Sequence, residues 1–169
     1  MRTSTSMPMT LALLLLAAPL AFANCESDDP GGTKVAAARA QVAQDCPCDQ
    51  SDPPAVNHGA YVKCAVGIAQ ARSTLDPSDA NFLPKTCKGA VKKCAARSVC
   101  GKPGFVTCCI TTDTGTKCKT KKDAMHCTDA DGTVSGTASS GCSSCCDACV
   151  NAPAPGSGPS CSPSGAFLE

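Results

Sequence analysis

Large aromatic side chains are almost absent from this chain of 169 residues. It contains no tryptophan, one tyrosine and four phenylalanines, and Phe22 belongs to the apolar leader at the N-terminus. Burial of apolar surface contributes ~25 cal/mol per Å², so a chain with so few large side chains builds only a marginal hydrophobic core. The sequence therefore needs another source of stability.

An excess of charge of either sign is also missing. The chain has 15 basic and 14 acidic residues and a formal net charge of +1. Overall charge therefore gives no indication of a nucleic-acid or acidic-surface partner, and no nucleic acid is expected. Two local basic clusters, KGAVKK at residues 88–93 and KCKTKK at residues 117–122, lack interleaved aromatic residues. Solvated surfaces are the simpler interpretation, and contact with an anionic polymer stays open.

Long apolar runs are confined to the first residues. The run at residues 11–20 is shorter than the roughly 20 residues of a membrane-spanning helix. A positive charge precedes it and small residues follow it, as is typical of a secretory signal peptide. We expect cleavage of residues 1–23, leaving a mature chain without a transmembrane segment that is secreted or lies in the periplasm or cell envelope. Lipid anchoring at Cys25 is a minor alternative, because lipoprotein processing prefers a smaller residue than Asn24 before the cysteine.

Cysteine is what the sequence has in abundance. All 16 cysteines lie beyond the predicted cleavage site, and disulfides form in exported proteins and contribute ~2–4 kcal/mol each. The simplest pairing has three bridges before residue 101, four between residues 108 and 149, and a separate pair of Cys25 and Cys161, although sequence alone does not fix the connectivity. The disulfide candidates of the two main groups are Cys46, Cys48, Cys64, Cys87, Cys94, Cys100, Cys108, Cys109, Cys118, Cys127, Cys142, Cys145, Cys146 and Cys149.

The densest cluster, CSSCCDACV at residues 142–150, raises three alternatives. Its abutting C-x-x-C units lack the longer separation of a standard zinc site. A redox pair needs an exposed cysteine of low pKa at a helix start within a βαβ pattern. Disulfides are favoured, because on a helix the four cysteines share one face. We predict a Cys-rich helical pin bridged to several distant segments, with no metal and no cofactor.

The first half of the mature chain is rich in helix-forming alanine. Residues 24–32, NCESDDPGG, are predicted to be an exposed lead-in to a helical Cys-rich module at residues 33–102. Its first helix covers residues 34–45, with Thr33 as N-cap.

Two further helices follow in this module. Asn57 is the expected cap of a helix at residues 58–75, whose inward stripe is Tyr61, Cys64, Ile68 and Leu75. After a turn or loop, a helix at residues 85–99 places on one face Cys87, Val91, Cys94 and Ser98.

The composition then shifts to Thr, Gly, Ser and Cys, which indicates a β-rich Cys-rich module at residues 103–150. Residues 104–140 are predicted to form an antiparallel sheet of two or three short strands. The boundary segment GKPG at residues 101–104 offers little to a core, so the halves should be separable. Residues 151–169, rich in Pro, Gly and Ser, are predicted to be a disordered tail. The fold class is a small disulfide-rich α+β protein, helical first and then β with the helical pin.

Two stretches carry a resemblance. CPCDQSDPPAVNHGAYVKCAV at residues 46–66, followed by GFVTCC and CSSCCDAC segments, resembles a pattern of uncharacterised exported Cys-rich proteins of environmental bacteria. The resemblance implies a secreted bacterial protein. It carries no assigned catalytic residue or ligand, so it implies no activity.

Few side chains suggest chemistry. Asn57, His58 and Tyr61 form a possible surface cluster, but no Ser-His-Asp spacing or paired carboxylates accompany them. A capped helix start with His58 half buried against the C-x-C turn is the simpler interpretation. DADG at residues 129–132 fails as a calcium loop, because Ala138 occupies the twelfth position where a carboxylate is needed. No catalytic residue is assigned.

These patterns favour an exported, non-catalytic binding or structural protein whose partner is an unknown extracellular protein or polymer. The alternative is a small secreted enzyme or a protease inhibitor that presents a rigid loop at residues 76–86. The residues identify neither substrate nor ligand, nor an oligomeric state.

Overall fold

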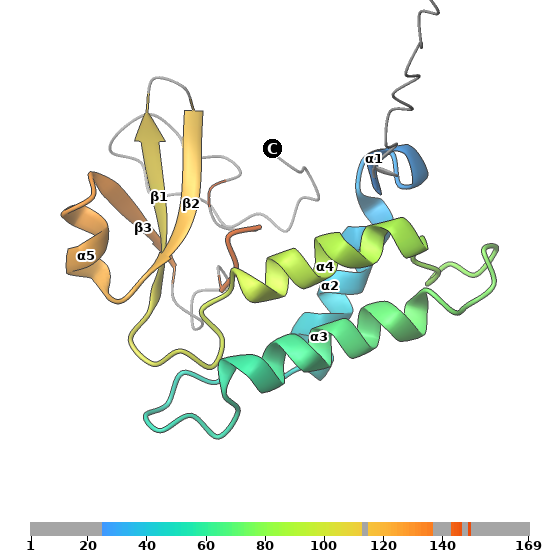
Figure 1. Cartoon of the computed structure of the whole chain (residues 1–169), viewed down its shortest axis with the longest axis horizontal. Coiled ribbons are helices and arrows are strands. Elements are labelled where there is room, and N and C mark those ends of the chain that lie inside the picture. The colour runs from blue at the N-terminus through green and yellow to red at the C-terminus, as the bar shows by residue number, and fades with distance from the viewer. Residues whose placement is uncertain (1–24, 113–114, 137–142, 147–148, 150–169) are drawn as a thin grey trace, which may run out of the picture.

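The computed structural model describes residues 25–112, 115–136, 143–146 and 149. A helical part lies at one end and a small sheet at the other (Figure 1). The predicted signal peptide, the predicted tail, Cys142 and Cys161 lie outside the described residues. No helix in the described ranges is long and apolar enough to cross a membrane.

Three helices pack around the larger of two apolar cores. They are α2 (Thr33–Asp45), α3 (His58–Arg72) and α4 (Lys88–Ala96), and α4 follows a turn of 3-10 helix, η1 (Lys85–Cys87). The core between them is built from small and medium side chains and from disulfides, which compensates for the lack of aromatic residues. Its buried members are Val35, Ala38, Val42, Cys46, Tyr61, Ala65, Ala69, Leu83, Cys87, Val91, Ala95 and Cys100.

Most residues of the segment before α2 are exposed, as its polar composition predicts, but the segment also contributes to the fold. It contains a short helix, α1 (Cys25–Asp28), and a buried carboxylate, Asp29. Asp29 accepts hydrogen bonds from the backbone N–H groups of Lys34 (3.0 Å) and Val35 (2.9 Å), which open α2. The predicted N-cap Thr33 is therefore wrong: Thr33 is the first helical residue, and Asp29 satisfies the free N–H groups from outside the helix.

The predicted cap of α3 is confirmed, since the Asn57 side chain accepts from the Ala60 N–H at 2.9 Å. The predicted stripe is only partly right. Tyr61 is buried, but Leu75 lies beyond the helix and is exposed. The buried face is completed by alanines and an arginine, because the close approach of α2 and α4 favours small side chains; its members are Tyr61, Ala65, Ala69 and Arg72.

The third helix also has the predicted inward face, since Cys87, Val91, Cys94 and Ser98 are all buried. The helix itself is shorter than the prediction. It ends at Ala96, and the Ser98 hydroxyl donates to the Ala95 carbonyl at 2.7 Å.

The β half contains the predicted antiparallel sheet. Its strands are β1 (Val106–Thr112), β2 (Gly115–Lys121) and β3 (Gly132–Gly136), in the order β2-β1-β3. A short helix that the sequence analysis did not predict, α5 (Ala124–Thr128), joins β2 to β3. The core here has three buried members, Val106, Cys108 and Cys127. The protein is therefore a small α+β fold stabilised by disulfides.

Seven disulfides join the described cysteines, and thirteen of the fourteen candidates take part; the other, Cys142, is not described. Cys25 is bonded to Cys87, so it is not a loose partner of Cys161, and its sulfur is not available for a lipid thioether. The pairs are Cys25–Cys87, Cys46–Cys64, Cys48–Cys100, Cys94–Cys146, Cys108–Cys127, Cys109–Cys149 and Cys118–Cys145.

The predicted helical pin is wrong at residues 143–146, where the chain forms a β-bridge and a turn. We call residues 143–146 with Cys149 the junction segment. Ser144 pairs with Ser98 in the bridge, because the backbone here bonds to the chain after α4 and not to itself. The bridging role is nevertheless present, since neighbouring cysteines of the junction segment reach three elements: α4, β2 and β1.

The two halves are also connected across the predicted boundary at residues 101–104. Cys94–Cys146 links the two halves covalently, so the predicted pairing of three and four bridges within the halves does not hold. The Val99 N–H donates to the Ser143 carbonyl (2.7 Å), and the Cys145 N–H donates to the Arg97 carbonyl (3.2 Å). The halves differ in secondary structure but are interlocked.

Candidate functional site

Asn57 and His58, two members of the predicted surface cluster at the start of α3, make structural contacts within the fold. The Nδ1 atom of His58 lies 2.9 Å from the carbonyl oxygen of Cys100, which is bonded to Cys48. His58 is thus half buried, as predicted, and its side chain contacts the carbonyl of a residue that is bridged to Cys48 of the C-x-C turn. Asn57 uses its side chain as the helix cap.

Tyr61 does not share a surface with these two residues. Its ring is buried in the core, and burial raises the pKa of its hydroxyl, an effect that the nearby positive charge of Arg39 partly offsets. A raised pKa keeps the hydroxyl protonated at neutral pH. The three residues therefore do not form one surface cluster: Asn57 caps α3, His58 contacts the Cys100 carbonyl and Tyr61 lies in the core.

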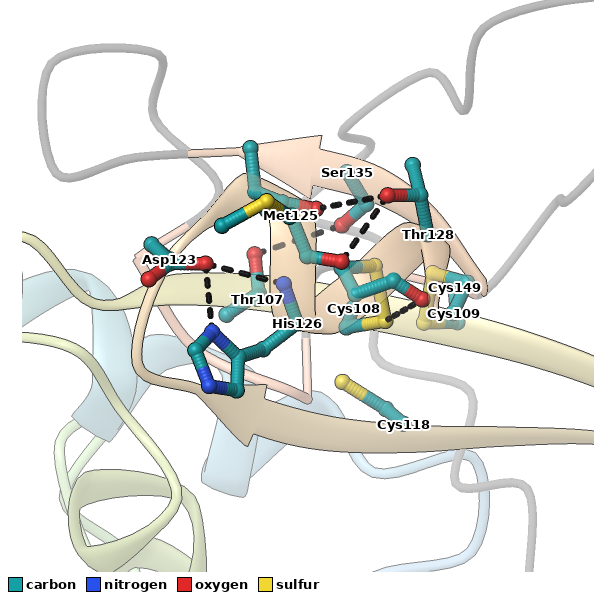
Figure 2. Close-up of a disulfide and its surroundings, with 12 residues drawn as sticks. Thr107, Cys108, Cys109, Cys118, Asp123, Met125, His126, Thr128, Ser135 and Cys149 are labelled. Atoms are coloured by element: carbon teal, nitrogen blue, oxygen red, sulfur yellow. Dashed lines mark hydrogen bonds and ion pairs between the residues drawn. A yellow bond between two sulfur atoms is a disulfide. The ribbon is translucent and has the colours of Figure 1, made fainter. Parts of the chain in front are cut away.

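The second histidine forms a pair with a carboxylate that the sequence analysis missed. Figure 2 shows the imidazole of His126 turned toward Asp123, with Nδ1 and Oδ1 separated by 2.8 Å. The same oxygen accepts the His126 backbone N–H and caps α5. These contacts hold the pKa of Asp123 below its usual value, and the backbone hydrogen bond is the largest cause. An aspartate directly before a short helical run is the signal that predicts this cap.

Cys25, Asp29 and Cys87 place metal-type ligand atoms within 4.8 Å of one another. The two sulfurs form a disulfide with each other, whereas metal binding requires a thiolate, so neither cysteine offers a metal ligand in this form. The Asp29 carboxylate accepts the N–H groups at the start of α2. The cluster is therefore a structural anchor between α1, α2 and η1.

The DADG segment forms a turn between α5 and β3. Asp129 is the C-cap of α5, and Asp131 adopts a positive φ of 54° before Gly132 begins β3. The Asp131 N–H donates to the Thr128 carbonyl at 2.9 Å. Asp-Gly acts here as turn residues.

The loop before η1 is built from consecutive turns. Asp76 accepts from the Ser78 hydroxyl (2.6 Å) and N–H (2.9 Å), and Asp79 accepts from the Asn81 N–H (2.7 Å). Leu83 is fully buried and anchors the end of the loop. A peptide segment that binds a partner by adding a strand to its sheet is extended. The loop at residues 76–86, the candidate inhibitory loop, instead contains consecutive turns.

A buried arginine, Arg72, lies between α2, α3 and this loop. One of its terminal nitrogens donates to Gln41 at 3.0 Å, whereas Nε and Nη2 have no partner among the described atoms. Burial lowers the pKa of Arg72, and the negative charge of Asp79 partly offsets this effect. Both unpartnered nitrogens are covered by protein atoms, so the guanidinium is a buried structural group and not an open site.

The two predicted basic clusters lie on different elements. Lys117, Lys119 and Lys121 alternate along β2, an edge strand of the described sheet. They lie opposite Ile110, Cys108 and Val106 in the register with β1. Lysines on an edge strand discourage pairing with another chain. The cluster at residues 88–93 lies on α4, where Lys92 and Lys93 are exposed and Lys88 is half buried.

Comparison with known proteins adds no assignment to this geometry. No protein-family model matches the chain, and neither a curated protein nor a solved structure shows significant similarity to it.

Proposed function

We propose that this chain is an exported protein of the extracellular space or cell envelope that acts as a rigid, non-catalytic binding or structural module. The observation that carries the proposal is the disulfide framework, in which three bridges lie within each half and Cys94–Cys146 joins the two halves. A pre-organised surface loses little conformational entropy on binding.

The proposed location is supported by the same bridges. Disulfides form and persist in oxidising compartments, and buried cysteines replace larger apolar side chains in both cores. The leader at residues 1–23 and the resemblance to exported bacterial proteins point to the same location.

The non-catalytic role is supported by the use of the reactive side chains. His58 contacts a backbone carbonyl, Tyr61 is buried, and Asp29 and Asp123 accept backbone N–H groups at helix starts. Each group is held by the fold in a contact that a substrate would have to displace. Surface complementarity is therefore favoured over acid–base chemistry.

The test compares the native mature protein with the same protein after reduction and alkylation. Both forms are incubated with washed bacterial envelopes, peptidoglycan, chitin, polygalacturonate and dextran, and bound protein is measured by cosedimentation or equilibrium dialysis. We expect saturable binding of the native form to at least one polymer, and at least tenfold weaker binding of the reduced form, because the bridges fix the surface.

The same samples test the alternative activities. Trypsin and subtilisin are assayed with an equimolar amount of the native protein, and each polymer is assayed for soluble fragments. Unchanged protease activity and intact polymers agree with the proposal. Stoichiometric protease inhibition, release of fragments, or no binding to any polymer would overturn it.

A further inference from the structure

The helix pair α3 and α4 contains no acidic residue. The chain has no aspartate or glutamate between residues 80 and 112, and α3 has none either. The cations of α4 and its C-terminal end are Lys88, Lys92, Lys93 and Arg97, which we call the cationic face. Positive charge is therefore concentrated there, although the whole chain is nearly neutral.

These charges are arranged in a way that costs helix stability. Lys88 and Lys92 are four residues apart, as are Lys93 and Arg97, and like charges at this spacing repel each other on a helix. Lys88 also lies at the N-terminus of α4, where the helix dipole favours negative charge. An ordinary solvated helix surface carries both signs in alternation, and this one does not.

The cationic face is open to solvent. Lys92, Lys93 and Arg97 are exposed, and no ion pair to them occurs among the described residues. Asp28 of α1 lies near the opposite, N-terminal end of α4, where it accepts from the Thr86 hydroxyl at 2.6 Å. The small residues Gly89 and Ala96 are also exposed on this helix.

At its C-terminal end the face is held rigidly. Cys94 of α4 is bonded to Cys146, and the Ser144 hydroxyl donates to the Cys94 carbonyl at 2.8 Å. The Arg97 carbonyl accepts the Cys145 N–H, so the backbone between the cations is tied to the junction segment. Figure 1 shows this segment beside the end of α4 that faces the sheet.

We infer that the cationic face binds an acidic polysaccharide, whose carboxylate or sulfate groups neutralise the repulsion between Lys92, Lys93 and Arg97. The inference rests on the proposed binding function and names the partner class. A polymer with repeated negative charges contacts several cations at once, so weak single contacts add up. The small exposed side chains between the cations leave room for a sugar ring to approach the helix.

Two other polyanions fit less well. Single-stranded nucleic acid is bound by stacking its bases on aromatic side chains, and α4 has none. A lipid surface is bound by amphipathic helices that insert large apolar side chains, whereas the exposed residues of α4 other than cations are glycine and alanine. Both become outcomes of the test.

The experiment measures the affinity of the native mature protein for polygalacturonate, with dextran as the neutral control and double-stranded DNA and anionic phosphatidylglycerol vesicles as competitors. We expect binding to polygalacturonate and none to dextran. The affinity should fall with increasing salt, because binding releases counterions from the polymer and added salt opposes that release.

Two matched variants locate the site. Lys92→Gln/Lys93→Gln/Arg97→Gln removes three charges from the cationic face, and Lys117→Gln/Lys119→Gln/Lys121→Gln removes three from β2. The first is expected to bind polygalacturonate at least about tenfold more weakly, and the second less than about threefold. The first should also be no less stable than the native protein in thermal unfolding, since like-charge repulsion is removed.

Several results would overturn the inference: no binding of polygalacturonate by the native protein, an equal loss in both variants, or tighter binding of DNA or vesicles. If both variants bind polygalacturonate normally, or if the native protein binds only chitin or peptidoglycan, the cationic face is not the site while the binding function stands. Failure of the native protein on every polymer would remove both proposals.

Discussion

Replacing Cys94 and Cys146 together by serine is expected to lower the free energy of unfolding by about 3 kcal/mol. The bridge spans 52 residues of sequence, but Cys109–Cys149 already connects β1 to the junction segment. The loop that Cys94–Cys146 closes is therefore about 20 residues, for which chain entropy gives about 3 kcal/mol. Denaturant unfolding of the native and variant proteins, with the other bridges intact, measures the difference.

Hydrogen exchange at individual N–H groups shows whether the variant loses stability at the contact between the two halves or throughout the protein. In the Cys94→Ser/Cys146→Ser variant, hydrogen exchange should accelerate at the Val99 and Cys145 N–H groups, which bond across the two halves. Cys46→Ser/Cys64→Ser is the control, because that bridge lies within the helical part. Equal protection of the two cross-boundary N–H groups in the Cys94→Ser/Cys146→Ser variant and the native protein would contradict the interlocked fold.

Gly101→Ala is expected to destabilise the protein by about 4 kcal/mol or more. Gly101 has φ +70°, where a side chain is strained by about 1–2 kcal/mol. A Cβ atom there would also overlap the backbone of Asn57 and His58, which cannot move as a flexible side chain can. The Gly101 carbonyl also accepts the His58 N–H at 3.2 Å, and the Gly101 N–H donates to the Asp49 carbonyl at 2.7 Å. Moving the backbone to relieve the overlap would break these two hydrogen bonds.

Gly104→Ala is the matched control for this prediction. Gly104 has a similar φ of +75°, but the nearest atom to a Cβ would be the Lys122 carbonyl oxygen at 3.7 Å, an ordinary contact. Its substitution should therefore cost only the backbone strain, about 1–2 kcal/mol. Comparable losses for Gly101→Ala and Gly104→Ala in denaturant unfolding would show that the close approach of residues 57, 58 and 101 does not exist.

Local signals in the sequence predict much of the secondary structure. Asn57 before an alanine-rich run predicts the start of α3, and the Thr-rich segments after residue 104 predict the sheet. These signals act within a few residues, through side-chain capping and backbone preference. The same reasoning places Cys87, Val91 and Cys94 on one face, because helical spacing alone decides it.

Long-range pairings are what the sequence could not predict. The spacing of the cysteines at residues 142–149 fits one helix face, but Ser144 pairs instead with Ser98, which lies 46 residues earlier. An even number of cysteines in each half allowed closed pairing, yet Cys94 crosses the boundary. Which cysteines meet depends on how the elements pack, and no local pattern records that.

For the candidate site, the sequence shows the residue types but not their burial or their neighbours in the fold. The cluster KGAVKK was evident, but its significance depends on the absence of carboxylates along α3 and α4 and on the exposure of Lys92 and Lys93. Conversely, His58 and Tyr61 suggested chemistry until the structure placed one against the Cys100 carbonyl and the other in the core.

The central claim, that the two halves are covalently interlocked through the junction segment, is tested most directly by mapping disulfides in the native protein. Cleavage after lysine and arginine isolates Cys94 on peptide 94–97 and Cys118 on peptide 118–119. Cleavage before aspartate places Cys146 on peptide 131–146, together with Cys142 and Cys145. Mass spectrometry without reduction should find peptides 94–97 and 118–119 joined to peptide 131–146, through Cys94–Cys146 and Cys118–Cys145, and released from it on reduction. Peptide 94–97 in a linked species that lacks peptide 131–146, or found free with an unmodified thiol, would contradict the interlocked fold.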